Sequence, residues 1–169
     1  MKAKLIIEGK EIEVEISEEE YKKLQPPEEK KTGYERVPKL DIYFYVTPSG
    51  GVDTTHEDYY DIDNECYESA NYYSSEIVAE NNARADKLMR QLRRFSVEHR
   101  EHEVDFNSTE TAKHYIYYDC IHNELDTTFT FFARVFGMVY FDSEETAQAA
   151  IDAFRDELIW YFTEYRDSL

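Results

Sequence analysis

Residues 71–95, NYYSSEIVAENNARADKLMRQLRRF, join an aromatic, strand-like segment to an amphipathic helix. Beyond the two serines, apolar residues recur at three- and four-residue spacing on one helical face: Ala85, Leu88, Met89, Leu92 and Phe95. Glutamates occupy the first turns and arginines the last, which suits the helix dipole. The stretch therefore predicts a helix that is capped by Ser74 or Ser75 and ends near Phe95.

A similar strand-to-helix junction, VYFDSE, occupies residues 139–144. It matches NYYSSE at its aromatic pair, a serine and the glutamate, and Ala147 then corresponds to Ala79. Upstream, LDTT at residues 125–128 matches VDTT at residues 52–55. These matches indicate two strand–strand–strand–helix units, although a chance similarity of two junctions would give the same pattern. The second helix, capped by Asp142 or Ser143, presents one apolar stripe: Ala147, Ile151, Phe154, Leu158, Tyr161 and Tyr165.

Each junction follows segments that are typical of β-strands. LDIYFYV at residues 40–46 and HYIYYD at residues 114–119 are rich in aromatic and β-branched residues. PSGG at residues 48–51 and IHNE at residues 121–124 are typical of turns. We therefore expect an α+β fold in which an antiparallel sheet is combined with two long helices.

The N-terminal part has a different organisation. AKLIIEGKEIEVEI, residues 3–16, alternates apolar and polar residues on both sides of a glycine, which predicts a β-hairpin. Ser17 and Glu20 form a capping-box pattern that opens a short helix through about Leu24. Residues 25–39 contain three prolines and are typical of a linker. We expect a hairpin–helix appendage at 1–24, a linker at 25–39 and the main domain at 40–169. The appendage is too small to bury a core alone, so it should dock on that domain or on a second copy of the chain. A homodimer is therefore one of the possibilities.

Composition points to a soluble, cytoplasmic protein. A chain of 169 residues fits one domain of ordinary size. No apolar run approaches the roughly 18 residues of a membrane span, and the N-terminus lacks the apolar core of a signal peptide. Cys66 and Cys120 are accordingly expected to stay reduced.

The net charge of −18 is unevenly distributed. Residues 40–83 hold ten carboxylates and no lysine or arginine, and residues 114–169 hold eleven acidic but only three basic residues. Such a field repels the phosphates of nucleic acid and favours a basic protein partner. We therefore expect neither direct nucleic-acid binding nor a membrane partner.

The charge is densest in residues 52–75, which carry seven carboxylates and five tyrosines. At the corresponding place the second unit has TFFARVFGMV, residues 130–139, so the fold does not require acid there. The segment is therefore either a solvated loop that aids solubility or a surface that binds a partner. On the second interpretation the candidate partner-binding residues are Asp53, Glu57, Asp58, Tyr59, Tyr60, Asp61, Asp63, Glu65, Tyr67 and Glu68.

Other patterns give weaker evidence for a site. DIDNE at residues 61–65 lacks the glycine and final glutamate of a calcium loop, and His99 with His102 has zinc-like spacing but no third ligand. The cysteines have no CxxC spacing. We therefore predict no metal, no cofactor and no enzymatic activity; a hydrolase with paired carboxylates is the weakest alternative. A basic stripe is expected to pair with the acidic strands within the chain: Arg84, Lys87, Arg90, Arg93, Arg94 and Arg100.

Three segments carry a resemblance to known proteins: GYERVPKLDIYFYV at 33–46, ANYYSSEIVAE at 70–80 and MVYFDSEETAQAAIDAFRDELIWYF at 138–162. They resemble small uncharacterised proteins of phages and prophages in Firmicutes, over about residues 32–169. By charge alone the chain is also similar to the DNA mimics among anti-CRISPR and anti-restriction inhibitors. These resemblances imply a non-enzymatic phage inhibitor whose acidic surface enters the basic channel of a host defence nuclease. The alternative is a phage structural or assembly module, or another protein-interaction module, without a nuclease target.

Overall fold

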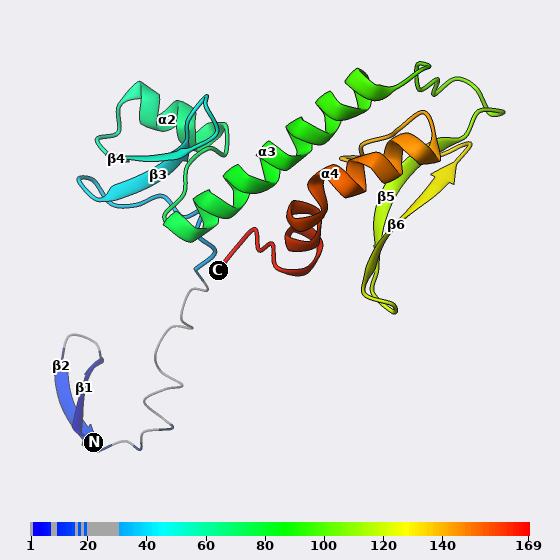
Figure 1. Cartoon of the computed structure of the whole chain (residues 1–169). Helices are drawn as coiled ribbons and strands as arrows, with labels where there is room; N and C mark the ends of the chain where they lie inside the picture. The colour runs from blue at the N-terminus through cyan, green and yellow to red at the C-terminus, as the bar shows by residue number, and fades with distance from the viewer. Residues whose placement is uncertain (1, 8–9, 16, 18, 20–30) are drawn as a thin grey trace. The chain divides into compact units, whose positions relative to one another are not determined.

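The computed structural model describes residues 2–7, 10–15, 17, 19 and 31–169. The chain divides into two compact units, Met1–Lys31 and Thr32–Leu169, each of which is described by itself below (Figure 1). The second unit holds all the candidate site residues.

The first unit contains the expected β-hairpin. Strands β1 (Lys2–Ile7) and β2 (Lys10–Glu15) pair antiparallel, with Leu5 opposite Ile12. The two alternating segments thus meet in the register that their apolar positions predict. The short helix expected from Ser17 lies almost wholly outside the described residues, as does the first part of the expected linker.

Residues 32–39, expected to complete the linker, instead pack on the second unit. Gly33 has a φ of +94° and lies so close to Val78 that an added Cβ would sit 2.6 Å from its Cγ2 atom. Only glycine tolerates both that conformation and that approach. The ring of Tyr34 then packs against Tyr73, with 5.3 Å between centroids. The main domain therefore begins at Thr32 rather than at residue 40.

The second unit starts with the first of two similar motifs. Strands β3 (Ile42–Val46) and β4 (Val52–His56) form an antiparallel hairpin. A third segment pairs with the other side of β3 through a single bridge between Tyr73 and Phe44. The chain then enters α3 (Glu76–His99), as the NYYSSE junction predicts.

The second motif repeats this plan. Strands β5 (Lys113–Asp119) and β6 (Glu124–Thr130) form an antiparallel hairpin, and Phe141 bridges to His114 on the other side of β5. The helix α4 (Glu144–Thr163) follows at once. The two strand–strand–strand–helix units are therefore present, and in each of them the third strand is reduced to one bridge.

Matched residues of the two motifs occupy matched positions. Ser75 and Ser143 are the N-caps of α3 and α4, and the Ser143 hydroxyl accepts a hydrogen bond from the Thr146 backbone N–H. Four residues into each helix, Ala79 and Ala147 are both fully buried. Small side chains at these positions let each helix approach the aromatic segment that precedes it.

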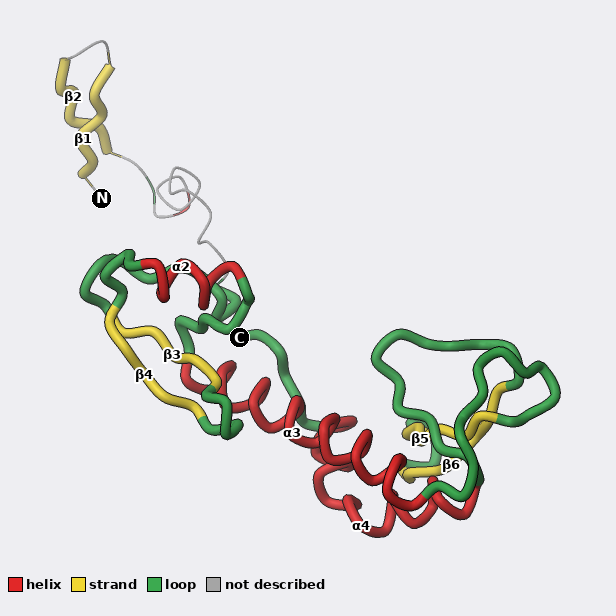
Figure 2. The backbone as a smooth tube through the Cα atoms, turned by 90° about the horizontal axis from the view of Figure 1, so that it is seen from above, coloured by secondary structure: helices red, strands yellow, loops and turns green. Residues whose placement is uncertain are grey.

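The fold is α+β, with antiparallel strand pairs and two long helices as expected, but the described strands do not join into one sheet. The described strands make three separate two-stranded sheets. Figures 1 and 2 show the cause in the second unit: β3–β4 lies at the N-terminal end of α3, and β5–β6 lies toward its other end. A helix of 24 residues is about 36 Å long, so the hairpins are too far apart to share hydrogen bonds.

The main core lies where α3, α4 and the second hairpin meet, and it contains a single cluster of buried side chains: Leu88, Leu92, Ile116, Phe141, Ala147, Ala150, Ile151 and Leu158. This confirms the apolar faces predicted for both helices. Phe154 differs from the prediction, because its backbone is non-helical (φ −124°, ψ 22°) and kinks α4. Its ring is only half-buried, and it meets Phe95 edge-on at 5.7 Å.

Candidate partner-binding site

The acidic segment is not the loop that we expected, because its centre is the helix α2 (Asp61–Glu68). Asp63 explains the start of this helix. Its Oδ2 atom accepts hydrogen bonds from the backbone N–H groups of Asp58 (3.1 Å) and Tyr60 (3.0 Å), and Tyr60 is the N-cap. A carboxylate at the third helical position that reaches back to the N-cap satisfies donors that the helix leaves unpaired.

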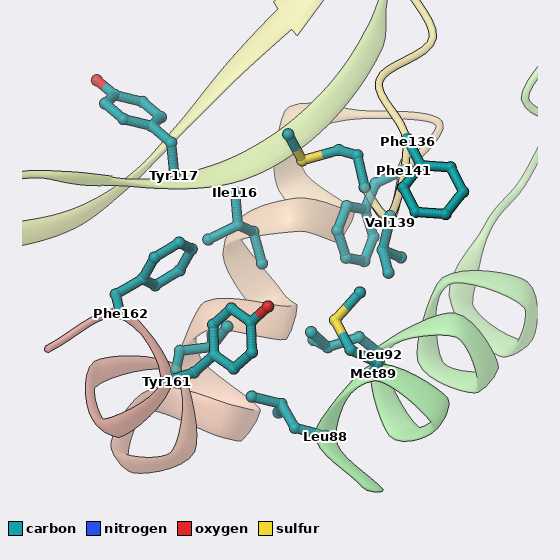
Figure 3. Close-up of a pocket in the computed structure, with 13 residues that line it drawn as sticks. Leu88, Met89, Leu92, Ile116, Tyr117, Phe136, Val139, Phe141, Tyr161 and Phe162 are labelled. Carbon is teal, nitrogen blue, oxygen red and sulfur yellow. The ribbon is translucent and has the colours of Figure 1, made fainter. Parts of the chain in front are cut away.

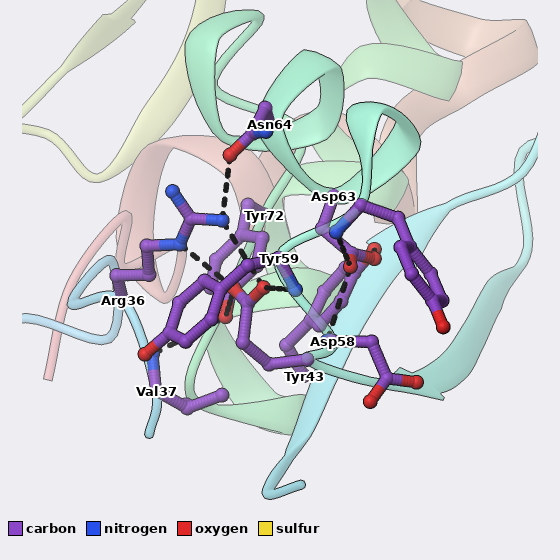
Figure 4. A network of polar contacts seen from close by, with 10 residues as sticks. Arg36, Val37, Tyr43, Asp58, Tyr59, Asp63, Asn64 and Tyr72 are labelled. Carbon is purple, nitrogen blue, oxygen red and sulfur yellow. Dashed lines mark hydrogen bonds and ion pairs between the residues drawn. The ribbon is translucent and has the colours of Figure 1, made fainter. Parts of the chain in front are cut away.

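A second carboxylate of the segment, Glu57, is fully buried in a polar network (Figure 4). It accepts hydrogen bonds from Arg36 Nε (2.8 Å), the Tyr72 hydroxyl (2.9 Å) and the Tyr59 backbone N–H (2.8 Å). The second guanidinium nitrogen of Arg36 adds a bond of 3.1 Å. The bonds from Arg36 are the main reason why the pKa of Glu57 is lowered, so this side chain is a buried carboxylate at neutral pH.

Two tyrosines complete the network. Tyr43 donates its hydroxyl proton to Asp63 Oδ1 at 2.9 Å, and its ring stacks on Tyr72 with 4.0 Å between centroids. Burial, together with the bonds to Asp63 and Glu57, raises the pKa of both tyrosine hydroxyls. Both hydroxyls therefore remain protonated donors to the carboxylates that they face.

Two of the candidate residues thus cannot contact a partner, since the side chains of Glu57 and Asp63 are enclosed by the fold. Their burial also explains how the segment tolerates its lack of basic residues. The cation comes from Arg36, which precedes the acidic segment and forms an ion pair with Glu57. The guanidinium of Arg36 also lies over the rings of Tyr59 (4.8 Å) and Tyr67 (5.3 Å).

Three other carboxylates form an exposed row on α2. Asp61, Glu65 and Glu68 are exposed and recur at four- and three-residue spacing, which places them on one helical face. We call these three residues the acidic ridge. Their helical positions span about 10.5 Å at 1.5 Å per residue. In the part of the chain that the structure describes, no member of the ridge has an ion-pair partner.

The remaining candidates also face outward. Asp53 is exposed on β4, and the half-buried Asp58 points its carboxylate away from the network in Figure 4. Tyr59, Tyr60 and Tyr67 are exposed beside the ridge, and Tyr60 is the most exposed of the three at 68%. The structure therefore brings the ridge and the three tyrosines together on and next to α2. Two of these rings, Tyr59 and Tyr67, pack against the guanidinium of Arg36.

The basic stripe of α3 does not neutralise this surface, contrary to our expectation. Arg84 pairs with Glu157 of α4 at 2.7 Å and lies 3.9 Å from the centre of the Trp160 ring. The other ion pairs of the stripe among the described residues are local, Arg94 with Glu98 and Arg100 with Glu103. The stripe pairs with residues other than those of the acidic segment, because α3 extends away from the first hairpin (Figure 1).

The calcium-like sequence and the zinc-like histidine pair do not form a metal site in the described residues. His99 stacks on Phe95 at 3.8 Å, and Asp63, in the centre of the calcium-like sequence, is committed to the cap of α2. Within those ranges no group of three or more histidine, cysteine, aspartate and glutamate side chains is placed to hold a metal ion. None of the helices placed there combines the length and apolar character that a membrane span requires.

One feature of the second motif was not predicted from the sequence. A cavity of about 300 Å³ lies between α3, β5 and α4, and its lining is mostly apolar, with Tyr117 and Tyr161 as the tyrosines in it. The signal in the sequence was the apolar segment at residues 130–139. That segment supplies one side of the cavity.

Comparisons with known proteins add no relative. No protein-family model matches the chain, and no curated protein or solved structure matches it significantly. The resemblance to phage proteins therefore stays a prediction.

Proposed function

We propose that the protein is a non-enzymatic inhibitor that presents the acidic ridge to the basic nucleic-acid channel of another protein. A host defence nuclease that a phage must disable, of the restriction or CRISPR type, is the target class that fits the resemblance and the charge. In this proposal the protein acts in the cytoplasm of the host cell. The observation that carries the proposal is the acidic ridge, three exposed carboxylates in a row that have no ion-pair partner among the described residues.

The spacing of the ridge supports an imitation of a nucleic-acid strand. Along one strand of duplex DNA the phosphates are about 3.4 Å apart in the direction of the helix axis, so about four of them span 10.5 Å. The ridge carries three carboxylates over that span. A basic groove that tracks one strand would therefore meet about three-quarters of that charge on α2.

The buried network supports the same proposal, because it makes the surface rigid. Glu57 and Asp63 fasten α2 and the segment before it to Arg36, Tyr43 and Tyr72. A preformed surface loses less conformational entropy when it binds than a flexible acidic tail does. The charges on the ridge should then act mainly through fast, electrostatically steered association.

The test compares two triple variants that remove the same charge. The ridge variant carries Asp61→Asn, Glu65→Gln and Glu68→Gln, and the control replaces exposed carboxylates elsewhere: Glu110→Gln, Glu124→Gln and Asp156→Asn. Proteins captured by the immobilised chain from a bacterial host lysate are identified, purified and assayed for binding to duplex DNA. We expect the wild-type chain to compete with DNA for them, and the ridge variant to bind roughly tenfold more weakly.

Three results would count against the proposal. These are equal binding by the ridge variant and the wild type, equal loss in the two triple variants, and capture that duplex DNA does not displace. Thermal melting of each variant shows whether its fold is intact. Exposed carboxylates of this kind should each change stability by less than about 0.5 kcal/mol.

A second candidate function is a protein-interaction module, such as a phage assembly protein, without a nuclease target. The observation that favours it is the group of exposed tyrosines beside the ridge, Tyr59, Tyr60 and Tyr67. Tyrosine offers rigid contact area at a low entropy cost. Salt separates the two candidates, because the complex of an electrostatic mimic weakens as the Debye length falls to about 3 Å at 1 M. A complex held by tyrosine rings would persist at that salt concentration.

A further inference from the structure

The cavity of the second motif is open to the surface and suited to an apolar group. Ile116 of β5 points into it, with Leu88 and Leu92 of α3 on one side and Tyr161 and Phe162 of α4 on another (Figure 3). Its volume is about 300 Å³. A dry apolar cavity of about 150 Å³ holds a benzene molecule, so this one has room for a phenyl ring and part of the chain that carries it.

The segment beside the cavity carries the ring that would fit. Phe136 lies at the rim, and its side chain is fully exposed at 104% of the reference area. The buried Lys113 ammonium donates a hydrogen bond to the Phe131 carbonyl at 3.0 Å, and the Val135 N–H donates to the Tyr140 hydroxyl at 2.7 Å. The residues that precede Phe136 are therefore hydrogen-bonded to the rest of the motif, whereas the ring of Phe136 projects into solvent.

This surface differs from the rest of the chain in charge. Residues 127–141 contain no carboxylate, and their one charged residue, Arg134, lies over the Phe106 ring at 4.4 Å. In a chain with a net charge of −18, most surfaces of two copies repel each other. Here two copies can approach without opposing carboxylates from this segment.

We propose that this face binds a second copy of the chain across a two-fold axis, with Phe136 of each copy entering the cavity of the other. A two-fold interface uses the same patch on both copies, so the projecting ring and the hollow must lie side by side on one face. Phe136 meets this condition, since it forms part of the rim of its own cavity. The inference is independent of the acidic ridge, which lies on α2 in the first motif.

The exposed apolar area bounds the size of the interface. Phe132 and Phe136 are almost fully exposed, and such rings bury about 150–250 Å² each on contact. Three half-exposed neighbours add to that area: Phe129, Val135 and Phe162. The sum is about 600 Å² per copy, or about 1,200 Å² in total, at the lower end of specific interfaces. We therefore expect a reversible dimer with a dissociation constant in the micromolar range.

Sedimentation velocity of the full chain, over roughly 1–200 µM to bracket that range, tests the proposal. We expect the weight-average sedimentation coefficient to rise with concentration toward the value of a dimer. The dimer should tighten between about 0.1 M and 1 M NaCl, because salt screens the repulsion between two acidic copies. A monomer at every concentration, or a dimer that salt weakens, would overturn the proposal.

A matched pair of variants locates the interface. Phe136→Ser should weaken the dimer by about thirtyfold, as expected for a ring in the centre of an interface. Ile121→Ser, which removes a similarly exposed side chain from the β5–β6 turn, should leave the dissociation constant unchanged. Indole, used as a soluble occupant of the cavity, should shift the wild-type chain toward monomer. Equal affinities of Phe136→Ser and wild type, equal losses in the two variants, or a dimer that indole leaves intact would each refute the arrangement.

Discussion

Replacing Glu57 by glutamine tests whether the acidic segment serves the fold as well as its surface. Glu57 is fully buried, and both of its oxygens accept hydrogen bonds. Oε2 faces Arg36 Nε and the Tyr72 hydroxyl, whereas Oε1 faces the other guanidinium nitrogen and the Tyr59 N–H. Whichever oxygen becomes the amide NH₂ group, that group faces one N–H of Arg36 and a second donor. The substitution therefore removes two hydrogen bonds, and it places the new NH₂ group opposite groups that also donate hydrogen bonds.

The size of the effect follows from these contacts. Hydrogen bonds to a charged group contribute about 1.5–3 kcal/mol each, and removing one partner of a buried ion pair costs about 3–5 kcal/mol. Arg36 keeps 27% of its side chain exposed, so water compensates part of its loss. We expect Glu57→Gln to lower the free energy of unfolding by about 3 kcal/mol at neutral pH. Glu65→Gln, the same chemical change on the exposed ridge, should cost less than about 0.5 kcal/mol.

Urea denaturation at several pH values adds an independent readout. The folded-state pKa of Glu57 is lowered, so its carboxylate stabilises the fold fully above its unfolded-state pKa of about 4.3. This contribution is lost as the pH falls through the folded-state pKa. The difference between wild type and Glu57→Gln should therefore be largest at pH 7 and should shrink below about pH 4. If Glu57→Gln is as mild as Glu65→Gln, or if the difference does not change with pH, the network does not hold this part of the fold.

Three further predictions concern the core, a helix cap and the first unit. Ile151→Ala should cost about 2–5 kcal/mol because this α4 side chain is fully buried, whereas Ile159→Ala, at a site that is 38% exposed, should cost less than half as much by urea midpoints. Ser143→Ala should cost about 1 kcal/mol, and Ser75→Ala clearly less, because only Ser143 makes a side-chain cap bond; equal changes in melting temperature would contradict this. Removing Met1–Lys31 should leave one cooperative thermal transition, because Thr32–Leu169 is a separate compact unit with its own core; loss of the transition would contradict that division.

Local signals account for what the sequence predicted well. The helices α3 and α4 were foreseen because their apolar periodicity and their capping serines are set by neighbouring residues. The hairpins were foreseen from aromatic and β-branched runs that are separated by turn residues. The duplicated junctions also placed the helix caps at Ser74 or Ser75 and at Asp142 or Ser143, and they aligned Ala79 with Ala147, which are both fully buried.

The candidate site was harder to predict, because its organisation depends on contacts between distant residues. Glu57 is buried by Arg36, which lies 21 positions earlier, and by Tyr72, which lies 15 positions later. In the sequence, Glu57 and Asp63 look the same as their exposed acidic neighbours. The helix α2 was missed because it lacks an apolar stripe, and its start depends on the bonds that Asp63 makes to backbone N–H groups. The separation of the hairpins was missed because strand composition does not reveal which strands pair.

The two motifs differ mainly in the segment between the second strand and the bridging strand, and this difference connects the two proposals. In the first motif the segment is α2, which carries the acidic ridge, and in the second it is the apolar segment that carries Phe136. These segments belong to hairpins that α3, about 36 Å long, holds apart (Figures 1 and 2). A dimer formed through the second motifs would therefore leave both ridges free. A dimer with two ridges could bind a dimeric or repetitive basic target twice. Once the first ridge is bound, the second binds the same target intramolecularly, which can raise the avidity by about 10²–10⁴.

Phe136→Ser should then weaken inhibition of such a target without changing the affinity of a single ridge, whereas the ridge variant should weaken both. If Phe136→Ser has no effect on inhibition at concentrations where the wild type is dimeric, the two surfaces act independently.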